Sequence, residues 1–187
     1  MNLTLKTTAL AGLILAHAAA GQAQDAAAPA VPTVDTATVG QFYTLETSDP
    51  WELRCTKTDT GNDPCQIFQR LRDEAGGDVA EFNMFKIPEG GPAAAGAIVV
   101  APLETLLKPG LVIQVDDKEP RSYSFAYCND YGCIARVGFT AEELGWMQAG
   151  NQAVLTIVPA LAPETKVSLN LSLKGFSDML EKTGEAK

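Results

Sequence analysis

The stretch AYCNDYGCIAR, residues 126–136, places two cysteines five positions apart around a turn. Four residues, NDYG, separate Cys128 from Cys133, which suits a hairpin loop, and Gly132 can supply the positive φ angle that such a loop needs. If strands flank the loop, the two cysteines face each other with Cβ atoms about 4–5 Å apart, within reach of a disulfide. The stretch therefore predicts a β-hairpin that is cross-linked close to its turn.

The other two cysteines, Cys55 and Cys65, enclose the turn-rich stretch TKTDTGNDP in the same way. Four cysteines allow three pairings, and hairpin geometry favours the two local ones. Zinc bound by four thiolates usually shows paired C-x-x-C spacings, and a thioredoxin-like site needs C-x-x-C at a helix N-terminus. We therefore expect two structural disulfides, with a labile, regulatory bond at Cys128 and Cys133 as the alternative.

The N-terminus has the pattern of an export signal. Lys6 precedes an apolar run from Thr8 to Ala20, followed by small residues that fit a cleavage site after Ala23. The run is shorter than the roughly 20 apolar residues of a membrane-spanning helix. We expect a signal peptide at 1–23 and a protein that is periplasmic, secreted or attached to the outer surface, but not integral to the membrane. Export to an oxidising compartment agrees with an even number of cysteines.

The remaining chain divides into a tether and a folded part. Residues 24–40 are rich in Ala, Pro and Thr and lack apolar periodicity, which predicts a flexible tether. Residues 41–183 are numerous enough for a single domain with its own core.

Charge and histidine content exclude several functions. The whole chain has a formal net charge of −9, and removal of the signal with Lys6 leaves 13 basic and 23 acidic residues, a net charge of −10. Such a protein repels nucleic-acid phosphates, so we expect no nucleic-acid partner. The only histidine, His17, leaves with the signal, so the mature chain has no histidine for a catalytic triad or a metal site. We expect no enzymatic activity, no catalytic residues, no cofactor and no bound metal.

Short strands separated by turns dominate the folded part. WELRC (51–55) alternates apolar and charged residues with the period of two that is typical of a half-buried strand. Further strands are predicted at 65–71, 79–87, 97–102, 111–117, 121–128, 133–139, 153–158 and 166–173. Thr140 and Glu143 form a capping-box pattern for a helix over 140–150, and residues 175–182 predict a second short helix. The expected fold is mainly β: an antiparallel β-sandwich or jelly-roll-like pair of sheets with two short helices and two disulfides.

Other residues could carry chemistry, but simpler interpretations suffice. Asp116, Asp117, Asn129 and Asp130 could bind calcium, although they lack a regular loop spacing. The carboxylate pairs 116–117 and 142–143 more simply belong to a turn and a helix cap. The glycine-rich stretch 88–96 lacks the context of a phosphate-binding loop. The aromatic residues that could line a ligand groove more often fill a sandwich core; they are Trp51, Phe82, Phe85, Tyr123, Phe125 and Trp146. Arg70, Arg72 and Lys86 could mark one solvated sheet face.

The order of these motifs resembles the invasion-associated locus B family. The resemblance is carried by Trp51 and Cys55, then Cys65, Pro102, KPGLVIQVDD, YSFAYCNDYGCIARVGFT, the capped helix, QAVLTI and VSLNLSLKGFSDML, and it runs from about Trp51 to Leu180. It implies an exported bacterial protein with a β-sandwich-like domain, and it brings no family catalytic residues. We therefore expect a disulfide-stapled binding or envelope-interaction module whose partner is a protein or an envelope component. The alternative is a redox-responsive protein that uses Cys128 and Cys133.

Overall fold

The computed structural model describes residues 32–73, 75–88 and 91–186. The predicted signal peptide and residues 24–31 of the predicted tether lie outside these residues. The described part of that tether, residues 32–40, contacts the domain. The Gly40 N–H donates to the Lys57 carbonyl (2.8 Å), and Ala37 packs against the hydrophobic core.

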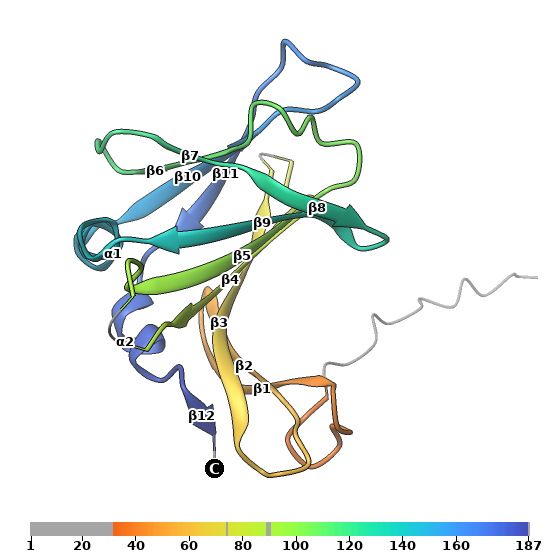
Figure 1. The fold of residues 1–187 in the computed structure, drawn as a ribbon, viewed down its shortest axis with the longest axis vertical. Helices are drawn as coiled ribbons and strands as arrows, with labels where there is room; N and C mark the ends of the chain where they lie inside the picture. The colour runs from red at the N-terminus through yellow and green to blue at the C-terminus, as the bar shows by residue number, and fades with distance from the viewer. Residues whose placement is uncertain (1–31, 74, 89–90, 187) are drawn as a thin grey trace, which may run out of the picture. The chain divides into compact units, whose positions relative to one another are not determined.

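Most strands belong to one large antiparallel sheet (Figure 1). Along the sheet, the strands are β1 (Phe42–Ser48), β2 (Trp51–Thr56), β3 (Asp63–Arg72), β4 (Asp78–Lys86), β5 (Ala95–Ala101), β9 (Gly132–Phe139) and β8 (Phe125–Asn129). The short strand β12 (Glu185–Ala186) also pairs with the start of β3. Neighbours from β1 to β5 follow one another in the chain, as expected where tight turns join antiparallel strands.

A second sheet of four strands packs against one face of the large sheet. Its order is β11 (Val167–Ser172), β10 (Gln152–Ile157), β6 (Leu111–Val115) and β7 (Arg121–Tyr123). All of its pairings are antiparallel as well. The predicted sandwich of two antiparallel sheets is therefore confirmed.

Alternating side chains of the two sheets form the core. On β2, Trp51, Leu53 and Cys55 are at most 3% exposed, as the alternation in WELRC predicts. The Trp51 ring lies 6.2 Å from the ring of Phe82, and 5.6 Å from that of Phe176 beyond the end of β11. Burial of such rings is a large part of the stabilisation of a small domain.

Both predicted helices are present and cover the core. α1 (Ala141–Ala149) starts with the predicted capping box, in which Thr140 and Glu143 exchange side-chain and backbone hydrogen bonds. α2 (Phe176–Glu181) buries Phe176, Met179 and Leu180. It follows Gly175, whose φ of 71° belongs to the left-handed region that favours glycine.

The prediction of one strand over 121–128 is wrong. The chain leaves the small sheet after β7 and enters the large sheet with β8, so Ser124 lies at the crossing between the sheets. Apolar alternation continues through the crossing, which is why the sequence pattern shows no break there. β1 was not predicted, because its burial pattern is interrupted by a register shift between Thr44 and Glu46 and only Tyr43 is buried.

One buried side chain joins the two sheets through hydrogen bonds. Gln69 on β3 is 4% exposed and points toward the small sheet. Its Nε2 donates to the Ser172 carbonyl (3.0 Å), and its Oε1 accepts from the Ser172 N–H (2.9 Å). The amide thus satisfies both backbone groups of Ser172 on the free edge of β11, as a neighbouring strand would.

Gln69→Leu should reduce the free energy of unfolding by about 2–4 kcal/mol, because the N–H and C=O of Ser172 lose their partners at about 1–3 kcal/mol each. Urea denaturation followed by tryptophan fluorescence measures this loss. Gln66→Leu, on the opposite face of the same strand, is the control and should cost about 1 kcal/mol or less. Equal losses in the two variants would show that Gln69 does not join the sheets.

Candidate binding hollow on the outer face of the large sheet

Both disulfides have the predicted local pairing. Cys55 lies directly opposite Cys65 in the β2–β3 register, and Cys128 directly opposite Cys133 in the β8–β9 register. The Cα–Cα distance is 4.0 Å in each bond. Neither pair in this form has a thiolate to bind a metal. Each bond holds one hairpin in a single register.

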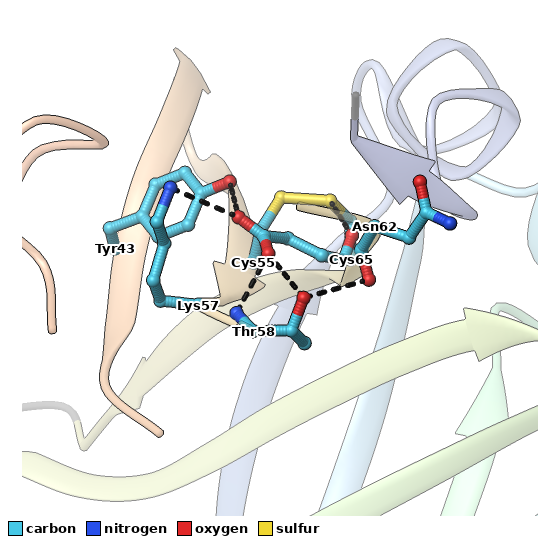
Figure 2. Close-up of a disulfide and its surroundings, with 7 residues drawn as sticks. Tyr43, Cys55, Lys57, Thr58, Asn62 and Cys65 are labelled. Carbon is cyan, nitrogen blue, oxygen red and sulfur yellow. Dashed lines mark hydrogen bonds and ion pairs between the residues drawn. A yellow bond between two sulfur atoms is a disulfide. The ribbon is translucent and has the colours of Figure 1, made fainter. Parts of the chain in front are cut away.

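A buried carboxylate beside the first disulfide connects β1 to the β2–β3 turn. Asp63 is 3% exposed and accepts hydrogen bonds from the Tyr43 hydroxyl (2.8 Å), the Thr58 N–H (2.7 Å) and the Thr58 hydroxyl (2.9 Å). The ammonium group of Lys57 lies 3.6 Å away. Figure 2 shows Tyr43, Lys57 and Thr58 grouped around the Cys55–Cys65 bond. The cluster fixes β1 and the turn on either side of the cross-link.

These contacts shift the pKa values of both acidic groups in the cluster. The backbone hydrogen bond from Thr58 is the largest cause that lowers the pKa of Asp63, with smaller contributions from Tyr43, the Thr58 hydroxyl and Lys57. Burial, followed by the hydrogen bond to Asp63, raises the pKa of Tyr43 to about 12. The cluster is therefore built around a charged carboxylate and a neutral phenol at neutral pH.

The face of the large sheet that points away from the small sheet contains a hollow of about 780 Å³. Its floor is aliphatic and comes from neighbouring strands, with Val79 on β4, Ile98 and Val100 on β5, and Ile134 on β9. Polar and charged side chains surround this floor: Arg54, Gln66, Arg70, Asp78, Glu81, Asn83 and Asn129. The hollow is thus a mixed apolar and polar surface of the size that small ligands or short segments occupy.

The two stapled hairpins contribute opposite sides of the hollow. Arg54, which precedes Cys55, lines the side near β1 and β2 together with Phe42. Asn129, which follows Cys128, lines the side near the β8–β9 turn together with Tyr131. Phe42 is 52% and Tyr131 89% exposed, so an aromatic ring stands at each side.

Gly132 allows the second hairpin to lie close against β5. A Cβ atom at this position would be 2.4 Å from the Ala101 carbonyl oxygen and 2.9 Å from a methyl group of Val100. The φ of Gly132 is 152°, a conformation that L residues rarely adopt. Glycine is therefore required both for the turn and for the packing of this side of the hollow.

Arginines and carboxylates are paired on this face. Arg70 and Arg72 both bind Asp78, at 3.0 Å and 2.8 Å. Hydrogen bonds from Arg72 and then Arg70 lower the pKa of Asp78. The guanidinium of Arg54 lies 3.3 Å from the centre of the Phe68 ring, which is 1% exposed although it belongs to the outer face. The arginines thus cover an aromatic ring as well as pair with acids.

Most of the aromatic residues that could line a ligand groove belong to the core instead. Trp51 and Phe82 lie in the core, and Tyr123, Phe125 and Trp146 pack against it. Phe85 is on the outer face next to Gly96, but it does not line the hollow. Lys86 does not share a face with Arg70 and Arg72, because its ammonium group pairs with Glu181 of α2 at 2.7 Å.

Two of the four candidate calcium ligands, Asp116 and Asn129, have structural roles. The Asp116 carboxylate accepts hydrogen bonds from the backbone N–H groups of Asn151 (3.0 Å) and Gln152 (3.2 Å), at the start of β10. Asn129 accepts from the Tyr131 N–H (3.0 Å) inside the β8–β9 turn. Within residues 32–73, 75–88 and 91–186, no three metal-binding side chains come together.

The family follows from comparison with known proteins. A family model described as invasion associated locus B (IalB) protein matches residues 51–184. The chain belongs to this family. The match extends from the start of β2 to Gly184, so it includes both disulfides and all but the β1 side of the hollow. The resemblance predicted from the sequence is confirmed.

Two named relatives and one solved structure agree with this assignment. An invasion protein B homolog of Brucella abortus is 25% identical over 137 residues, 73% of this chain and 77% of that protein. Invasion protein B of Bartonella bacilliformis is 27% identical over 153 residues, 81% of this chain and 80% of that protein. The crystal structure of invasion associated protein B from Bartonella henselae has a TM-score of 0.61 and 21% identity, and the match covers 73% of this chain and 93% of that one. This last similarity supports the fold.

Within the part of the chain that the structure describes, no helix is both long and apolar enough to span a bilayer.

Asp63→Asn should make the free energy of unfolding depend less on pH at acidic pH. The folded state lowers the pKa of Asp63, so the ionised carboxylate stabilises the fold above its unfolded pKa of about 3.9, and this contribution is lost as pH falls through the lower folded pKa. We expect the variant to be less stable than the wild type at pH 7 and the difference to shrink as the pH falls below about 4. Urea denaturation at a series of pH values measures it, with the exposed Asp59→Asn as a control for charge. A pH-independent difference would contradict the role of the ionised carboxylate.

Proposed function

We propose that this protein is an exported, non-enzymatic binding protein that holds a protein or an envelope component in the hollow on the outer face of its large sheet. The observation that carries the proposal is the pair of disulfide-stapled hairpins on opposite sides of an open hollow. Cross-links that hold both sides reduce the conformational entropy that binding would otherwise cost. A rigid, open and chemically mixed surface suits recognition.

The two disulfides and the family, together with the predicted export signal, support a location outside the cytoplasm, which we propose to be the periplasm. Disulfides persist in oxidising compartments, and this chain carries two without a free cysteine.

The chain has no histidine beyond the predicted signal peptide, which supports the non-enzymatic part of the proposal. General acid–base catalysis near neutral pH most often uses histidine or a carboxylic acid with a raised pKa. In the hollow, Asp78 has the opposite tendency, because its arginine partners lower its pKa. The charged groups of the hollow are better suited to holding a partner than to transferring protons.

Ile98→Trp should weaken binding, because an indole ring would fill the floor of the hollow. The mature, oxidised protein would be screened against a random dodecapeptide phage library and against an array of envelope lipids and peptidoglycan fragments. Each ligand obtained should bind Ile98→Trp at least about tenfold more weakly, a loss of about 1.4 kcal/mol.

Val154→Trp is the matched control, since Val154 is a half-buried aliphatic residue on the outer face of the small sheet. It should bind like the wild type, and thermal melting verifies that both variants fold. The proposal fails if neither collection yields a ligand, or if every ligand tolerates Ile98→Trp.

A second candidate function is a redox response through Cys128 and Cys133. The observation in its favour is that one half of this bond, Cys128, is exposed, although Cys133 is 2% exposed. In the other bond both halves are buried, with Cys55 0% and Cys65 6% exposed. Thiol–disulfide exchange requires access of the attacking thiolate to a sulfur atom. The second disulfide is therefore the more accessible of the two, through Cys128.

Under native conditions, limiting dithiothreitol followed by alkylation and peptide mapping should label Cys128 and Cys133 well before Cys55 and Cys65. A redox function further requires that the Cys128–Cys133 bond equilibrate with glutathione buffers of periplasmic or cytosolic potential. If the bond stays oxidised in an excess of reduced glutathione at equilibrium, it is a structural cross-link and the redox function is excluded.

A further inference from the structure

We infer that the occupant of the hollow is an acidic, extended protein segment that places an apolar side chain on the aliphatic floor. The inference rests on the proposed function and specifies its partner. Three features of the outer face point to this chemistry: the distribution of arginines, the hydrogen-bonding groups that these arginines leave unused, and the composition of the floor and its surroundings.

Arginine is concentrated on one face of an acidic protein. The chain contains five arginines, and four of them lie on the strands of the large sheet at positions that face outward: Arg54, Arg70, Arg72 and Arg136. Arg54 and Arg70 line the hollow itself. Arg136 lies beside it, directly opposite the floor residue Ile98 in the β5–β9 register. No lysine among the described residues lines the hollow. The guanidinium fork matches the geometry of a carboxylate better than the lysine ammonium does. This face therefore differs from the rest of a chain whose formal net charge is −9.

The carboxylates of the protein use only part of the donor capacity of these arginines. Each guanidinium has five N–H donors. Arg54 contacts Glu52 through Nε alone, and Arg72 contacts Asp78 through Nε alone. Arg136 is within 4 Å of no carboxylate among the described residues, and its guanidinium lies 5.7 Å from the Tyr127 ring centre. The two carboxylates of the hollow, Asp78 and Glu81, are already paired with arginines, and water solvates the remaining donors of the free protein. Arg136 is therefore the cation beside the hollow that a carboxylate of a partner can pair with in place of water.

The floor and its surroundings favour a peptide over a sugar or a lipid. Sugar sites usually place an aromatic face beneath the sugar ring, whereas this floor is made of branched aliphatic side chains and the two aromatic rings, Phe42 and Tyr131, stand at its sides. A lipid tail needs an enclosed apolar cavity, and this hollow is open to solvent along the sheet. A single Leu-, Val- or Phe-sized side chain can contact Ile98, Val100 and Ile134 without being enclosed.

Amide side chains provide the remaining contact for a peptide backbone. Gln66 Nε2 donates to Asn83 Oδ1 (3.1 Å), and the Gln66 Oε1 has no hydrogen bond to any described residue. It can accept from a partner N–H. The protein already contains this mode of recognition on its other face, where Gln69 binds both backbone groups of Ser172.

The test uses the peptides selected from the random dodecapeptide library on the mature, oxidised protein. We expect the selected set to be enriched in Asp and Glu around at least one Leu, Ile, Val or Phe. A synthetic copy of the best peptide should bind with an affinity that falls as salt is raised. The same peptide with Lys in place of each acid should bind at least about tenfold more weakly, as should the original peptide to Arg136→Ala.

Arg121→Ala is the matched control, because Arg121 is the one arginine on the small sheet and lies over Trp146. It should leave the affinity unchanged. Arg136→Glu should restore part of the binding of the Lys-containing peptide, which a purely structural role of Arg136 would not do.

The outcomes separate this inference from the proposed function. Ligands that come only from the lipid or glycan array, selected peptides without acids, or acidic peptides that tolerate Arg136→Ala overturn the inference. All three leave the proposed function standing as long as Ile98→Trp weakens binding at least about tenfold. The lack of any ligand that is sensitive to Ile98→Trp overturns both.

Discussion

The positions of the two disulfides set the constraint on which the rest of the structure depends. The large sheet runs β1-β2-β3-β4-β5-β9-β8, and the cross-links join β2 to β3 on one flank and β9 to β8 on the other. The strand pairs between these two flanks have no disulfide cross-link. In a sheet, a slip of one residue moves every side chain to the opposite face. Such a slip in β2 would bury Arg54 and expose Trp51, so the register of the flanks determines both the core and the outer face.

Buried polar side chains add further connections between elements that the disulfides do not join. Asp63 connects β1 to the turn that the first disulfide closes, and Gln69 connects the large sheet to the small one. Both side chains are buried and have several partners, so their hydrogen bonds are directional contacts within a core otherwise held by apolar packing. The hollow lies on the opposite face of the large sheet, which points away from the small sheet. Its two sides belong to the flanks that are held most firmly.

Sequence patterns identified the parts of the fold that depend on neighbouring residues. The alternation in WELRC, the turn between Cys128 and Cys133 and the capping box at Thr140 each contain their own local signal, and the structure has them as expected. The crossing at Ser124 has no such signal, because apolar alternation continues while the chain changes sheets. The hollow was missed for a related reason. Phe42 and Tyr131 come from opposite ends of the sheet, and only the strand order brings them to one surface. The outward-facing arginines were a partial signal, since Arg70 and Arg72 were recognised as one face.

Gln69 has a further consequence for how the protein behaves among its own copies. An exposed strand edge with free N–H and C=O groups is a template for pairing with another chain. β11 is the outermost strand of the small sheet, and its last residue already has its outward-facing backbone groups bound by an amide from within the molecule. That side chain occupies the site at which a foreign strand would begin to add. A core residue of the sandwich thus also protects the sheet against edge-to-edge aggregation.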